Sequence, residues 1–63
     1  MTQKELLYVE DAIEHQRTII ETITWAIEQL EDEDLADYLN NELLTHQKLE
    51  SNLMKLLKES SNV

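Results

Sequence analysis

The stretch that decides the fold is LEDEDL, Leu30 to Leu35. It contains neither Gly nor Pro, so one continuous helix has to be weighed against two helices joined by a turn. The apolar pattern favours the turn, because the step from Leu30 to Leu35 rotates the stripe by about 500° at about 100° per residue, away from the preceding line. The four acids between them also repel one another, and Asp32 or Asp34 can cap a new helix. The sequence therefore predicts a helical hairpin.

The segment before the turn has the periodicity of an amphipathic helix. Thr2 and Glu5 have the spacing of a capping box, in which each side chain accepts a hydrogen bond from the backbone of the other residue. Apolar residues then recur at alternating steps of three and four, with one polar interruption, at Leu6, Val9, Ile13, Gln16, Ile20, Ile23, Ile27 and Leu30. Ala12, Ile19 and Ala26 widen the stripe on one side. We predict a helix over about residues 3–30.

The segment after the turn repeats the same steps. The stripe that we expect to face the core consists of Leu35, Leu39, Glu42, His46, Leu49, Leu53 and Leu56. It is joined on one flank by Ala36, Leu43, Glu50 and Leu57. We predict a second helix over about residues 34–58, and an all-α antiparallel hairpin that forms one domain, residues 1–63.

The length of the chain, 63 residues, indicates that the hairpin needs a partner. A core of this size barely offsets the loss of chain entropy, and two antiparallel helices leave their apolar stripes partly open. Pairing two hairpins encloses the stripes in a four-helix bundle, so we expect a homodimer. The expected dimer core consists of Leu6, Val9, Ile13, Ile20, Ile23, Ile27, Leu39, Leu49, Leu53 and Leu56.

The charge of the chain disfavours two classes of partner. Fourteen acidic and five basic side chains give a formal net charge of −9, which repels nucleic-acid phosphates and anionic lipid headgroups. The N-terminal residues lack the apolar run of a secretory signal, and no stretch approaches the length of a membrane span. We expect no nucleic-acid or membrane partner, and a location in the cytoplasm at synthesis.

Three polar residues follow one another at one-turn spacing on the second helix: Glu42, His46 and Glu50. One interpretation is a metal site built from both subunits, because a neutral imidazole and carboxylates can share a cation. Another is a polar core layer of Gln16, Glu42, His46 and Glu50, which costs stability but can fix register and partner number. The third is that they are partly solvated boundary residues. In a hairpin that turns near Asp32, Gln16 is expected opposite Leu49 and Glu50.

Two apolar residues fall outside the stripes. Trp25 lies opposite the stripe of the first helix, and Leu44 lies opposite that of the second. Isolated exposed apolar residues are common, and the alternative is a second contact surface for a larger assembly. The acidic run itself lacks the ligand alternation and glycine of a calcium loop. No nucleophile constellation accompanies the two histidines, so we do not expect an enzyme.

The opening KELLYVEDAIEHQ, Lys4 to Gln16, resembles the LLYLEDAL-x-H-[EQ] start of small proteins of spore-forming Firmicutes related to the spore coat protein F family. The similarity extends in outline through the acidic turn to LNNELLTHQKLESNLMKLL, which has a His in mid-helix. The family is regarded as ferritin-like, with helical hairpins that make a four-helix bundle. The resemblance implies a structural protein associated with the spore coat, with other coat proteins as potential partners.

The sequence departs from two patterns of these relatives. It lacks the Tyr- and Trp-rich tail of many coat F proteins, and with it any cross-linking role of such a tail. Ferritin-like di-iron enzymes use Glu-x-x-His pairs, but Leu43 precedes His46 by three residues and Ala12 precedes His15. We therefore expect no cofactor. The alternative functions are a metal-binding or degenerate di-iron protein and an acidic cytosolic adaptor for a basic partner.

Overall fold

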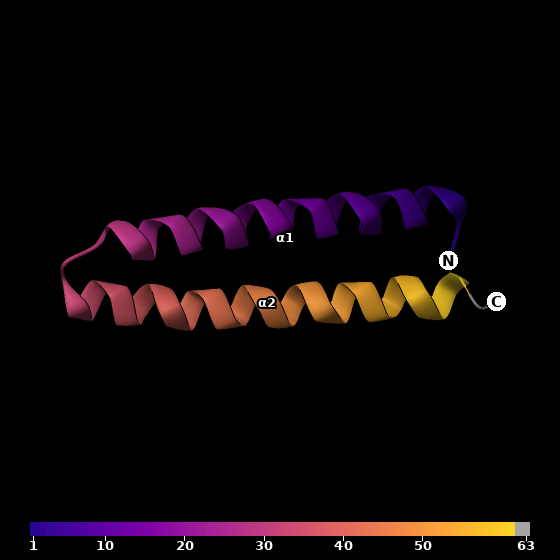
Figure 1. Cartoon of the computed structure of the whole chain (residues 1–63). Coiled ribbons are helices and arrows are strands. Elements are labelled where there is room, and N and C mark those ends of the chain that lie inside the picture. Colours follow the sequence, from indigo (N-terminus) through magenta and orange to yellow (C-terminus); the bar gives the residue numbers. More distant parts are fainter. Residues whose placement is uncertain (62–63) are drawn as a thin grey trace.

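The computed structural model describes residues 1–61. Two helices, α1 (Gln3–Gln29) and α2 (Glu33–Ser61), run antiparallel and pack against each other along their length (Figure 1). The Cα atoms span 47 × 14 × 11 Å, so the molecule is a thin rod. The predicted hairpin is confirmed, and α2 continues three residues beyond its predicted end. No helix in this part of the chain carries an apolar stretch long enough to cross a membrane.

The start of α1 is the predicted capping box. The Glu5 amide donates to Oγ1 of Thr2 over 3.1 Å, and the Thr2 amide donates to Oε1 of Glu5 over 2.8 Å. The hydrogen bond from the Thr2 backbone, assisted by the Thr2 side chain, lowers the pKa of the Glu5 carboxyl below its ordinary value. The box satisfies two amides that have no partner within the helix.

The turn that joins the helices uses Asp32 as the cap of α2. Its Oδ1 accepts a hydrogen bond from the Leu35 amide over 3.1 Å, and its carbonyl accepts one from the Ala36 amide over 3.0 Å. Leu30 has left the helix, with φ −85° and ψ 138°. Of the two caps that the sequence offered, Asp32 is therefore the one used, and three residues suffice to reverse the chain.

The face of α2 that contacts α1 differs from the predicted stripe. The difference can be described with heptad positions a to g, in which Ile13, Ile20 and Ile27 of α1 are assigned to position a. Apart from Glu42, the half-buried residues of α2 occupy positions a and d of an equivalent heptad: Ala36, Leu39, Leu43, His46, Glu50, Leu53, Leu57 and Ser60. The predicted stripe combined positions d and g, and of its g residues Glu42 is half-buried whereas Leu35, Leu49 and Leu56 are exposed. The face is thus rotated toward the flank of Ala36, Leu43, Glu50 and Leu57.

The a and d positions divide the surface of the hairpin into two flanks. We define the e flank as Glu10, Arg17 and Thr24 of α1 with Asn40, Gln47 and Met54 of α2. We define the g flank as Ala12, Ile19 and Ala26 of α1 with Leu35, Glu42, Leu49 and Leu56 of α2. Arg17 and Met54 line one groove between the helices, so the e positions of both helices lie on the same side. The g positions, across the a and d seam, lie together on the other side.

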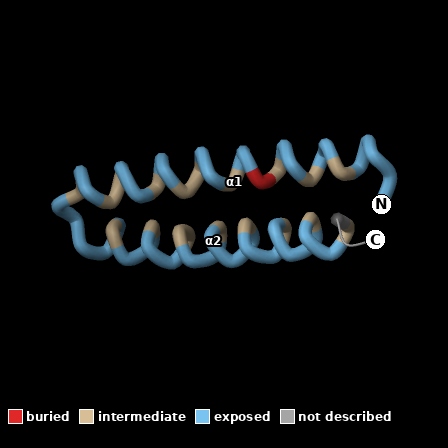
Figure 2. Tube along the Cα trace, turned by 45° about the vertical axis from the view of Figure 1, so that its right-hand side comes forward, coloured by how far each residue is buried: buried red, intermediate tan, exposed pale blue. Residues whose placement is uncertain are grey.

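The hairpin buries little of its apolar surface. Half-buried residues of each helix face the other helix in Figure 2, and Ile13, 4% exposed, is the one buried side chain among the described residues. All members of the expected dimer core except Leu49 and Leu56 are buried or half-buried between the two helices. Trp25 and Leu44 are both exposed, as predicted. The two helices therefore form a seam rather than a closed core.

Candidate functional site

A hydrogen bond between Gln16 and His46 crosses the middle of the hairpin. Nδ1 of His46 lies 2.7 Å from Oε1 of Gln16, and both side chains are partly buried. An amide oxygen only accepts, so Nδ1 of His46 is the donor in this hydrogen bond. Gln16 was expected opposite Leu49 and Glu50; its own hydrogen bond goes to His46, about one helical turn away, whereas the neighbouring Arg17 contacts Glu50.

An ion pair lies beside this hydrogen bond. Nε of Arg17 lies 3.5 Å from Oε2 of Glu50, and Nη1 lies 3.7 Å from Oε1 of Glu14 on its own helix. The Glu50 side chain is about a quarter exposed and the Arg17 side chain half exposed. An ion pair with this much solvent access contributes about 0–1 kcal/mol. Its main effect is to place Glu50 next to Arg17 rather than next to His46.

Arg17 was missed by the sequence analysis. It is the only arginine in the chain, and its i, i+3 spacing from Glu14 indicates a surface ion pair on one helix. Its contact with the second helix depends on the register, which the spacing alone does not reveal.

Glu42 lies apart from the other members of the predicted polar layer. It is half-buried on the g flank, and no hydrogen bond or ion pair joins it to another side chain among residues 1–61. The structure therefore joins Gln16 to His46 and Glu50 to Arg17, and leaves Glu42 at the edge of the seam. Within one hairpin, the predicted polar layer is therefore two separate contacts, the hydrogen bond and the ion pair.

The metal interpretation is not supported by the arrangement within one hairpin. In the described part of the chain, no three His, Asp or Glu side chains lie close enough together to hold a metal ion. Glu42, His46 and Glu50 share a face of α2, but Glu50 is engaged by Arg17 and His46 by Gln16. A metal site that uses these residues would need ligands from a second chain.

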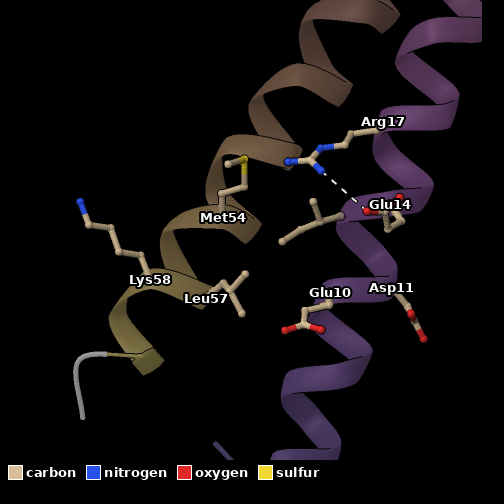
Figure 3. Close-up of a pocket in the computed structure, with 8 residues that line it drawn as sticks. Glu10, Asp11, Glu14, Arg17, Met54, Leu57 and Lys58 are labelled. Carbon is tan, nitrogen blue, oxygen red and sulfur yellow. Dashed lines mark ion pairs between the residues drawn. The ribbon is translucent and has the colours of Figure 1, made fainter.

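A groove with a volume of about 530 Å³ opens on the e flank, toward the end of the hairpin that holds the chain termini. Its apolar surface comes from Ile13, Met54 and Leu57, and charged side chains surround it (Figure 3). These are Glu10, Asp11, Glu14, Arg17 and Lys58. The groove therefore combines a small apolar strip with a mainly acidic border.

The comparisons with known proteins leave the function to be argued from these features. No protein-family model, curated protein or solved structure matches this chain.

Proposed function

We propose that this chain is a small structural protein that acts by self-association, with two hairpins pairing into a four-helix bundle. The observation that carries the proposal is the open seam, in which Ile13 is the one buried side chain among the described residues. Leu35, Leu49 and Leu56 of α2 remain exposed, and each apolar side chain gains about 1.5–3 kcal/mol when it is fully buried. Pairing provides that burial.

The total surface supports the same proposal. The chain exposes 5124 Å², whereas a compact monomeric protein of its mass, 7.4 kDa, exposes about 4,200 Å². The excess of about 900 Å² is close to the area of about 800 Å² that each partner buries in a stable interface of standard size. Association through one interface of standard size would therefore reduce the exposed area of the chain to that of a compact protein of the same mass.

The place of this bundle in the cell is proposed from the resemblance to the spore coat protein F family, carried by Lys4 to Gln16. A rod with an acidic surface and no assigned chemistry suits a coat component that binds other coat proteins. A fluorescent fusion should then collect around the forming spore, and coat genes should lie beside the gene. A diffuse signal throughout sporulation would refute the assignment to the coat.

The self-association is tested by sedimentation of the purified chain at micromolar concentration. We expect a dimer in the wild type, and unfolded chains for Ile20→Glu, because that change places an unpaired charge in the seam. Thr24→Glu, an exposed position of the same helix, is the matched control and should remain dimeric. A wild type that is a stable, helical monomer would exclude the proposal.

A further inference from the structure

The two flanks of the hairpin differ in chemistry. The α1 row of the e flank carries the charged residues Glu10 and Arg17, and the groove beside it is bordered by further charges. The g flank is apolar except for Glu42 in mid-row and Glu5 at the start of α1, where Thr2 holds its carboxylate. Bundle helices use positions a, d and either e or g for their core, and in this chain the additional apolar position is g on both helices.

The large side chains of the g flank are accessible in the single hairpin. Leu35 is 45% exposed, Leu49 is 42% exposed and Leu56 is 48% exposed. They occupy three of the four g positions along α2, so they form an apolar ridge beside the seam that Glu42 interrupts. The facing row of α1 is lower, because two of its three members are Ala12 and Ala26. The flank therefore has a high apolar edge on α2 and a low one on α1.

We infer that the g flank is the surface on which a second copy of this chain docks; this inference rests on the proposed self-association and specifies its interface. The excess surface of about 900 Å² is close to the area of about 800 Å² that one partner contributes to a standard interface. The e flank is the less suitable surface, because docking there would bury the charges of Glu10 and Arg17.

The different sizes of the side chains on the two edges of the g flank favour one arrangement of the two copies. Gln16 contacts His46 and Arg17 contacts Glu50, so Ala12 lies between the levels of Leu49 and Leu56. By the same count, Ala26 lies between the levels of Leu35 and Glu42. A twofold axis parallel to the helices places α1 of one copy over α2 of the other at unchanged levels. The low α1 edge of one copy then faces the leucine edge of its partner, and every neighbouring pair of helices is antiparallel.

This arrangement buries Glu42 in the interface between the two copies. Glu42 lies between the levels of Ile19 and Ala26 of α1, so Glu42 of one copy faces apolar side chains of the other. A charge buried without a partner weakens association, and its replacement by an apolar residue of similar size strengthens it. Glu42 is therefore the one residue of the g flank whose removal should tighten the dimer.

The first arm of the test compares Leu49→Glu with Met54→Glu, a position on the opposite flank with nearly the same exposure, 44%. Sedimentation equilibrium should show a dissociation constant raised about a hundredfold for Leu49→Glu, because a charge enters an apolar interface, and changed by less than about threefold for Met54→Glu. The reverse order, or equal effects of the two variants, would overturn the inference.

The second arm does not depend on how well a disrupted variant folds. Glu42→Leu should lower the dissociation constant about tenfold or more, whereas Gln47→Leu on the e flank should leave it nearly unchanged. Tightening by Gln47→Leu alone would place the interface on the e flank. A dimeric wild type with that result would refute the g flank while the proposed self-association stands, and a monomeric wild type would refute both.

Discussion

The side chains of Gln16 and His46, thirty residues apart in the chain, meet at 2.7 Å across the seam of the hairpin. Sliding one helix by a turn would separate them. The hydrogen bond therefore favours one register of the two helices. The rest of the seam is lined mostly by similar branched residues, which distinguish poorly between registers. Polar pairs of this kind add specificity more than stability.

The double substitution Gln16→Leu with His46→Leu should keep or raise the stability of the protein. Replacing both members of a polar pair by apolar groups leaves no unsatisfied donor or acceptor, so the change in stability should be near zero or favourable. The cost should appear as mixed register or a mixed number of chains, visible in sedimentation. Gln16→Leu alone, which leaves the imidazole unpaired, is the control and should be less stable than the double variant. A double variant that melts well below the wild type would contradict this role.

Metal ions should not stabilise the wild type. Binding at a single site adds RT ln(1 + [L]/Kd), about 2.7 kcal/mol at a hundredfold excess over Kd, which is a shift of several degrees in a chain of this size. Thermal melts with a chelator, with zinc and with iron should coincide, because His46 and Glu50 are already engaged by other side chains. A metal-dependent rise that disappears in His46→Leu would instead establish the shared metal site.

Trp25 should report a surface that stays open after association. It is 64% exposed and lies at position f of its heptad, away from both flanks. Its fluorescence should have the emission maximum of a solvated indole, and Trp25→Ala should change the free energy of unfolding by less than about 0.5 kcal/mol. Strongly blue-shifted emission would reveal a further contact on the outer face of α1.

Asp32→Ala should destabilise the hairpin by about 1 kcal/mol, because the Leu35 amide loses its capping oxygen. For a chain of this length the melting temperature should fall by about 4–8 °C. Asp34→Ala is the matched control, since it removes an acid from the same turn of α2 without removing the cap, and it should cost less. Equal losses for the two variants would mean that the helix dipole, rather than the cap, governs the start of α2.

Much of the fold could be predicted because its signals are local. The Thr2 and Glu5 capping box, the turn at the acidic run and the exposure of Trp25 all follow from spacing within one helix. The face of α2 could not be predicted in the same way. The residues at its d positions form a continuous stripe either with the g positions, which include Leu49 and Leu56, or with the a positions, which include Leu43 and Leu57. Only packing against α1 decides between them.

The register of the hairpin, and with it the candidate site, was less predictable for a related reason. It depends on how many residues the turn consumes, and a change of two in the turn moves each contact across the seam by half a turn or more. The composition of the polar layer follows from that register. The sequence identified Gln16 and His46 as unusual residues on apolar faces, but their pairing with each other, and that of Glu50 with Arg17, required the tertiary structure.

The start of the chain and the end of α2 lie together, where the Ser60 hydroxyl donates to Sδ of Met1 over 3.7 Å, and the acidic turn lies at the other end (Figure 1). Two hairpins related by an axis parallel to their helices would gather both pairs of ends at one pole and both acidic turns at the other. Such a particle would be polar along its long axis, with both acidic turns at one pole and the starts of α1 and ends of α2 at the other. A basic surface would then bind it at one pole only, and every bound copy would have the same orientation.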